Sequence, residues 1–191
     1  MATQKKPRFP TLAPESMSAE QRAAAEGIIN GPRGGLRGPF NAWLRSPVFA
    51  DRMQKVGEYL RFNSSIPADL NEFAILITAR VWTSQYEWYA HHAMAMKAGL
   101  PPAIAADLAS GRRPAGMTED QRLVYEFCTE LHRDHSVSDA TFEATAARFG
   151  EQGVVDLIAV SGYYVAVSMT LNVAEVQIPP EATPLPHLPK A

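Results

Sequence analysis

The chain has 191 residues, of which 46% are hydrophobic and 20% charged, and its formal net charge is -2. This length and composition suit one globular domain with one substantial core. Because the charges are nearly balanced and the basic residues are scattered, we do not expect a protein that binds nucleic acid.

Targeting and membrane-spanning segments are not apparent in the sequence. Residues 1–16 contain no apolar run of the kind found in secretory signals. The longest apolar run, 157–171, is interrupted by Ser161 and Gly162 and is shorter than the roughly 20 residues that cross a bilayer. We therefore expect a cytoplasmic protein in which this run is a buried helix.

Proline-rich segments at both ends predict extended arms, 1–17 and 179–191, around a single helical domain, 18–178. Arms of this kind often lie across a neighbouring subunit. Between them, helical spacing and helix start signals recur without any alternating strand pattern. The predicted fold class is therefore all-α.

The first predicted helix begins at Ser18, whose hydroxyl can cap the first turn while Gln21 reaches back, and it ends at Asn30. The segment 31–39 that follows is rich in glycine and proline but lacks the pattern of a phosphate-binding loop. We interpret it as a surface connection.

Eight further helices are predicted along the chain. They cover residues 40–44, 47–62, 68–81, 84–98, 101–110, 118–132, 138–149 and 153–172. The helix at 68–81 and the last helix are apolar on nearly every side, so both belong in the interior and should pack against each other. A charged residue inside this pair needs a partner.

Three polar residues share one face of the predicted helix 84–98. Ser84, Glu87 and His91 stand at positions i, i+3 and i+7, so Glu87 can reach His91 across one turn. A carboxylate beside an imidazole orients the ring and favours its protonated form, and neighbouring aromatic walls exclude water. This combination is suited to general acid and base catalysis near neutral pH.

Purely structural interpretations of the same residues remain open from the local pattern alone. Ser84 and Glu87 also fit a capping box that satisfies free amides at the helix start. Glu72, nineteen residues before His91, can be a first-turn carboxylate favoured by its helix dipole.

A family resemblance favours the catalytic interpretation of these residues over the purely structural one. Glu72, the motif Ser84-x-x-Glu87-x-x-x-His91 and the following segment 98–101 resemble the signature of the carboxymuconolactone decarboxylase and alkylhydroperoxidase D superfamily, over roughly residues 40–175. The resemblance implies an alkylhydroperoxidase D-like helical bundle that brings Glu72 to His91. In the peroxidase branch, cysteines hold the positions of Ser84 and Glu87; in the decarboxylase branch, a glutamate precedes the histidine by four residues, as here.

The expected function is that of a cofactor-independent lyase or lactone hydrolase. Its substrate would be a small carboxylated compound, such as a lactone from aromatic breakdown. His91 moves the proton, Glu87 pairs with it, and Glu72 supports or relays. No metal is expected, since the pair His132 and His135 stands at a helix end, where cations meet terminal carbonyls.

The predicted substrate-binding residues are aromatic, polar and cationic. They are Trp82, Ser84, Trp88, Arg45 and Tyr164. Arg45 is chosen, with Arg37 and Arg80 as further candidates, because a guanidinium meets a carboxylate through two parallel hydrogen bonds. Tyr163 and Tyr164 carry hydroxyls into a buried helix, so one of them is expected at the pocket.

Two alternatives to the lyase are a peroxidase of the alkylhydroperoxidase type and a non-catalytic helical binding protein. The single cysteine, Cys128, cannot form a C-x-x-C motif and lies on an apolar helix face, which argues against the peroxidase. The resemblance also implies a homo-oligomer, a trimer or a hexamer.

Overall fold

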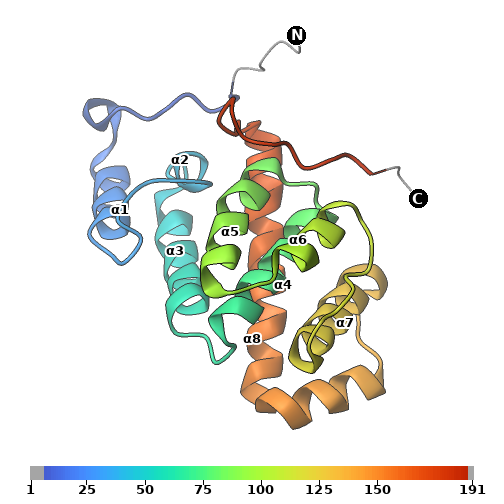
Figure 1. Cartoon of the computed structure of the whole chain (residues 1–191). Helices are drawn as coiled ribbons and strands as arrows, with labels where there is room; N and C mark the ends of the chain where they lie inside the picture. The colour runs from blue at the N-terminus through green and yellow to red at the C-terminus, as the bar shows by residue number, and fades with distance from the viewer. Residues whose placement is uncertain (1–6, 189–191) are drawn as a thin grey trace.

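In a computed structural model, residues 7–188 of the chain are described, and within that range the secondary structure is entirely helical (Figure 1). This confirms the all-α prediction. The elements are a 3-10 helix, η1, and helices α1 to α8. In chain order they span Pro14–Ser16 (η1), Ala19–Ile29 (α1), Phe40–Trp43 (α2), Pro47–Phe62 (α3), Ala68–Val81 (α4), Gln85–Ala98 (α5), Pro102–Ala109 (α6), Glu119–Asp134 (α7) and Asp139–Ala174 (α8).

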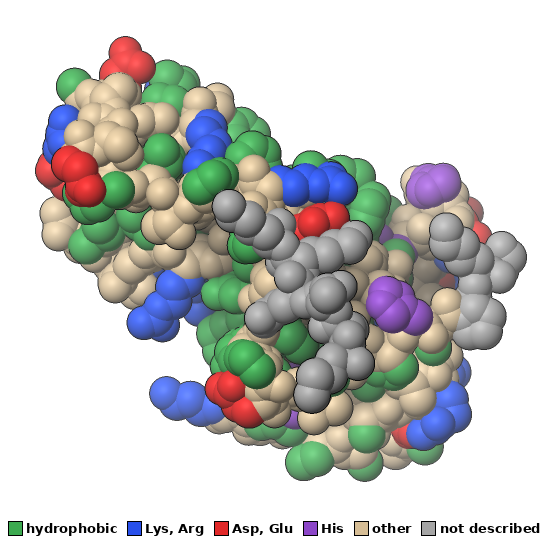
Figure 2. All heavy atoms as spheres, turned by 90° about the horizontal axis from the view of Figure 1, so that it is seen from above, with side chains coloured by type: hydrophobic (Ala, Val, Ile, Leu, Met, Phe, Trp, Pro, Cys, Tyr) green, Lys and Arg blue, Asp and Glu red, His purple; other side chains and the backbone are tan. Residues whose placement is uncertain are grey.

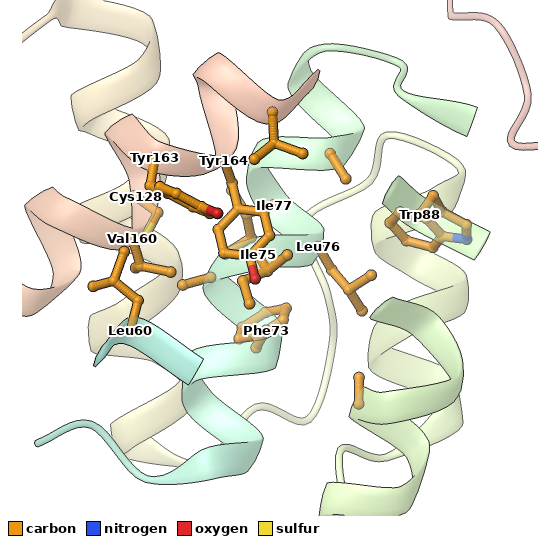
Figure 3. Close-up of a cluster of buried hydrophobic side chains, with 14 of the residues drawn as sticks. Leu60, Phe73, Ile75, Leu76, Ile77, Trp88, Cys128, Val160, Tyr163 and Tyr164 are labelled. Atoms are coloured by element: carbon orange, nitrogen blue, oxygen red, sulfur yellow. The ribbon is translucent and has the colours of Figure 1, made fainter. Parts of the chain in front are cut away.

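Helix α4 lies at the centre of the bundle and contacts α5, α6, α7 and α8 (Figure 1). Its side chains explain this place, because Phe73, Ile75 and Leu76 point to different sides of the helix and none of them is exposed. Figure 3 shows these residues together with Leu60 of α3 and Tyr164 of α8, which belong to the same hydrophobic core. The predicted packing of the two apolar helices against each other is therefore confirmed.

Helix α8 bends at Gly150, where φ is 71° and ψ is 173°. The two helices predicted at 138–149 and 153–172 are thus the two arms of α8. By length and composition α8 could cross a membrane, with a mean hydropathy of 1.7, but 56% of its apolar stretch is buried within the structure. This is what a core helix of a globular protein requires, as the sequence predicted.

The proline-rich arms lie on the chain's own helices. On the N-terminal side, the amide of Leu12 donates to Oδ1 of Asn41. On the C-terminal side, Gln85 exchanges two hydrogen bonds of 2.8 Å with the backbone of Leu185, and Arg80 donates to the carbonyl of Pro186. The outermost parts of the two predicted arms, 1–6 and 189–191, lie outside the described residues.

The surface carries charges of both signs. On the face seen in Figure 2, lysine and arginine side chains lie apart from one another, among hydrophobic and acidic side chains. That face therefore offers no continuous basic strip of the kind that follows a phosphate backbone.

Asp156 of α8 holds the loop between α3 and α4 against the bundle. Its buried carboxylate accepts hydrogen bonds from the amide of Ser65 at 2.8 Å, the hydroxyl of Ser65 at 2.7 Å and the hydroxyl of Tyr59 at 3.0 Å. Although burial alone raises the pKa of Asp156, these hydrogen bonds lower it below its usual range.

Replacing Asp156 with alanine should lower the free energy of unfolding by about 2–3 kcal/mol, because the amide and hydroxyl donors lose a charged acceptor. Urea unfolding followed by circular dichroism measures the change. Asp51→Asn, which affects an ion pair exposed to solvent, is the control and should change the stability by less than about 1 kcal/mol. Equal stability of Asp156→Ala and the wild type would contradict this role.

Candidate functional site

The turn between α4 and α5 brings two carboxylates to one histidine. Thr83, with a φ of 45°, reverses the chain, so that α5 packs along α4. Nδ1 of His91 lies 2.6 Å from Oε2 of Glu72, and Nε2 of His91 lies 2.9 Å from Oε1 of Glu87. The side chains of His91 and Glu87 are 6% and 5% exposed, and that of Glu72 is 13% exposed. We call these three residues the carboxylate–histidine triad.

The triad holds a buried positive charge. Burial lowers the pKa of His91, but the charge of Glu87 and hydrogen bonds to both carboxylates outweigh it and raise the pKa from 6.5 to about 9. At neutral pH the imidazolium therefore donates one hydrogen bond to each glutamate. With both carboxylates ionised, the triad carries one net negative charge.

Two tyrosines of α8 continue the site. The ring of Tyr164 meets the ring of His91 edge to face, with centroids 4.9 Å apart, and the ring of Tyr163 lies 5.2 Å from that of Tyr164. Burial raises the pKa of Tyr163 to about 12 and that of Tyr164 well above its usual value. Both phenols therefore stay neutral and retain a proton to donate.

Next to the triad lies a cavity of about 570 Å³, a size typical of sites for small molecules. Glu87 and His91 both line it, whereas Glu72 does not and contacts His91 outside the lining. Most of the remaining wall is apolar or aromatic. Its aromatic residues are Phe40, Tyr86, Tyr89, Tyr163 and Tyr164.

Three arginines also line the cavity; Arg37 was a further candidate from the sequence, whereas Arg33 and Arg61 were not considered there. Arg33 and Arg37 come from the glycine-rich segment between α1 and α2, and Arg61 comes from α3. The segment 31–39 is a connection between helices, as predicted, and it also contributes to the cavity wall. Two arginines among backbone-bending glycines were the available signal.

The predicted substrate-binding residues are only partly brought to the cavity. Tyr164 lines it, but Ser84, Trp82 and Trp88 do not. Ser84 is fully buried, and its hydroxyl neither caps α5 nor finds a hydrogen-bond partner. The capping-box interpretation of Ser84 and Glu87 was therefore wrong, because Glu87 turns to His91 instead.

The side chains of the two tryptophans and of Arg45 have other surroundings. Trp88 stacks on His92 with centroids 6.0 Å apart. Trp82 ends α4, and its carbonyl accepts a hydrogen bond from Asn172. Arg45 donates to the backbone carbonyls of Asn41 and Pro10. Arg45 thus fastens the N-terminal arm and stands away from the cavity, contrary to its predicted role.

Arg80, a further candidate for a clamp, is buried and donates to the carbonyls of Ala109 and Pro186. His132 lies 2.9 Å from the hydroxyl of Thr78, and burial lowers its pKa. Among residues 7–188, no cluster of three or more histidine, cysteine or acidic side chains has the arrangement of a metal site.

Cys128 is remote from this chemistry. It is fully buried in the core, where Sγ lies 3.7 Å from the hydroxyl of Ser161, and it does not line the cavity. Burial raises the pKa of the thiol to about 12. The reactive thiolate is therefore scarce at neutral pH.

The imidazole of His91 should stay protonated through pH 8 and titrate near pH 9. Because the folded pKa exceeds the ordinary 6.5, this charge stabilises the fold fully below about pH 6.5, and the contribution is lost as the pH rises through about 9. Nitrogen-15 NMR of the histidine rings measures the titration. Glu87→Gln should lower the pKa, while His132 serves as an internal reference that titrates below 6.5. Titration of His91 at or below 6.5 would contradict the triad's electrostatics.

Comparison with known proteins gives the fold. No protein-family model matches the sequence, and no curated protein matches it. A peroxidase-related protein with an alkylhydroperoxidase AhpD core, from Ralstonia eutropha JMP134, is 17% identical with a TM-score of 0.74, over 92% of this chain and 93% of that chain. A peroxidase-related protein from Silicibacter sp. TM1040 is 16% identical with a TM-score of 0.73, over 95% and 96%.

A third similar structure is that of the debrominase Bmp8, in a variant bound to 2,3,4-tribromopyrrole. It is 11% identical with a TM-score of 0.70, over 93% of this chain and 95% of that chain. These alignments extend over nearly the whole length of each chain, and they agree with the fold that the sequence resemblance implied. The chain therefore has the alkylhydroperoxidase AhpD-like helical fold.

Proposed function

We propose that this protein is a thiol-independent enzyme that transfers a proton to or from a small carboxylated compound, with a lactone as the leading substrate class. The observation that carries the proposal is the carboxylate–histidine triad, which places a charged imidazole and the Glu87 carboxylate at the wall of a substrate-sized cavity. Buried groups with a shifted pKa beside a cavity are frequent in active sites.

Glu87 is the group that meets the substrate in this proposal. Both ring nitrogens of His91 are occupied by carboxylates, so His91 passes its proton to the substrate through Glu87. Glu72 holds the ring from the other side and keeps a negative charge next to Nδ1. Replacing either partner changes how easily Nε2 releases its proton.

In a decarboxylation, the bond between a substrate carbon and its carboxylate breaks and carbon dioxide leaves. The electron pair passes into a conjugated carbonyl group as an enolate. Glu87, protonated by Nε2 of His91, then protonates the carbon. Water returns a proton to His91, and the hydroxide that remains combines with the released carbon dioxide as bicarbonate. The neutral Tyr164 at the cavity can donate to the developing oxyanion, a contribution typically worth about 10²–10³ in rate.

Peroxidase chemistry has less support. The buried Cys128 keeps its proton and lies outside the cavity wall, and the sequence holds no second cysteine. The debrominase among the similar structures indicates that this fold carries more than one chemistry. A non-catalytic binding protein would use the same cavity without needing the triad.

Glu87→Gln and His91→Gln should each reduce turnover of a small carboxylated lactone by about 10²–10⁴-fold, since each removes a step of the proton transfer. Product formation is followed by proton NMR with a panel of such lactones, which separates decarboxylation from ring opening. Cys128→Ala and the exposed Glu143→Gln are controls that should retain wild-type turnover. Full activity of His91→Gln would exclude the proposal, and loss of activity only in Cys128→Ala would favour the peroxidase.

We also propose that the protein is cytoplasmic, as expected from the sequence, and that it forms a homo-oligomer. An apolar stripe along the second arm of α8 supports self-association. Its members are spaced at helical intervals and are 45% to 61% exposed: Val155, Ile158, Met169 and Val173. A second copy of the chain would cover this stripe by symmetry.

Ile158→Glu and Met169→Glu, combined, should shift the protein to a smaller species, because two carboxylates would be buried in an apolar interface. Size-exclusion chromatography with light scattering measures the mass. Phe142→Glu, on the same helix but before the bend at Gly150, alters a similarly exposed apolar residue and should leave the mass unchanged. A wild-type monomer would contradict the oligomer.

A further inference from the structure

The cavity's three arginines differ from every other arginine of the described residues in lacking a carboxylate or carbonyl partner. Among polar groups of these residues, Arg37 has no partner, Arg33 adjoins only the hydroxyl of Tyr163, and Arg61 donates only to the sulfur of Met94 at 3.1 Å. Elsewhere in residues 7–188, each guanidinium meets a carboxylate or a carbonyl, as Arg148 meets Asp120. The unmatched positive charge is therefore concentrated at one cavity.

Arg33 is the most enclosed of the three. Its guanidinium carbon lies 5.1 Å from the centre of the Phe40 ring, and two of its nitrogens, Nε and Nη2, are buried without a hydrogen-bond partner. Leaving buried donors unpaired destabilises a protein. This destabilisation is offset when the protein's ligand supplies the acceptor.

Helix α3 is shaped to admit this side chain. Gly57, buried in the middle of α3, has helical backbone angles that any residue could adopt, and glycine there stabilises a helix less than alanine would. A Cβ at this position would stand 2.2 Å from Nη2 of Arg33 and 2.1 Å from the hydroxyl of Tyr163. The missing side chain is therefore what lets Arg33 and Tyr163 converge.

The loop that carries Arg33 is bent by glycines as well. Gly34 and Gly38 have φ values of 66° and 67°, which other residues rarely adopt. The turn at Gly34 follows Arg33 directly, and Gly38 brings the loop against Tyr86 of α5.

A row of contacting side chains joins the Arg33 guanidinium to the triad. Arg33 adjoins Tyr163 at Gly57, Tyr163 meets Tyr164 edge to face, and Tyr164 meets His91 in the same way. A flat ligand that lies along this row has one end at the guanidinium and the other at Glu87 and His91.

We propose that Arg33, supported by Arg61 and the hydroxyl of Tyr163, forms a carboxylate-binding subsite that orients a planar, single-ring or lactone carboxylate toward Glu87. The inference rests on the proposed function for the reacting end of the ligand only. A guanidinium with free N–H groups beside an aromatic wall is well suited to a carboxylate attached to a planar group. The carboxylate at this subsite is the one that stays on the molecule, whereas any carboxylate that leaves must sit near Glu87.

Binding of benzoate, with benzamide as its neutral counterpart, tests the subsite without requiring catalysis. Isothermal titration calorimetry with the full chain should show benzoate binding at least tenfold more tightly than benzamide, a difference of about 1.4 kcal/mol. Arg33→Gln should weaken benzoate by tenfold or more and remove the preference, and Arg33→Lys should keep part of it. Gly57→Ala, which displaces the guanidinium, should act in the same direction.

Arg52→Gln is the matched control, because Arg52 lies on α3 with its charge facing the exposed Asp51, and it should bind benzoate like the wild type. Circular dichroism and urea unfolding confirm that each variant is folded. Unchanged benzoate binding in Arg33→Gln, or no preference for benzoate over benzamide in the wild type, would overturn the subsite. Glu87→Gln should still bind benzoate, so a protein with this preference but no triad-dependent turnover would retain the subsite and lose the proposed function.

Discussion

The structure depends on keeping one positive charge and two negative charges inside a helical bundle. His91 can be buried in its charged form only because Glu72 and Glu87 accept a hydrogen bond from each ring nitrogen. The reversal at Thr83 and the close packing of α5 on α4 bring these groups together. The apolar faces of α4 and α8 then exclude water from one side of the triad, and the cavity opens on the other.

The charge of the cavity follows from the same arrangement. The triad carries one net negative charge, whereas Arg33, Arg37 and Arg61 bring three positive charges that no carboxylate pairs with among the described residues. The wall is therefore electrostatically complementary to an anionic ligand, and its aromatic residues select a flat one. Gly57 makes this arrangement possible, because an alanine there would occupy the space of the Arg33 guanidinium.

The sequence predicted much of the fold because helix periodicity and capping are local properties. The helix starts at Ser18 and Thr118 and the break near Gly150 were all readable from spacing and residue type. The contact between Glu87 and His91 was readable for the same reason, since one helical turn separates them. Residues whose roles depend on tertiary contacts were harder to select from the sequence. Nothing in the local sequence distinguishes Arg33 from other loop arginines, because its place depends on Gly57 of α3. Arg45 was selected for a role that its hydrogen bonds to backbone carbonyls exclude.

A crystal structure with a bound carboxylated lactone would show whether one ligand spans the cavity from the Arg33 guanidinium to the triad. We expect a ligand carboxylate within hydrogen-bond distance of the Arg33 guanidinium and a ring carbon within about 3.5 Å of a Glu87 carboxylate oxygen. A lactone bound with its carboxylate outside the cavity, or with no atom near Glu87, would contradict both the orientation and the proton-transfer role of the triad.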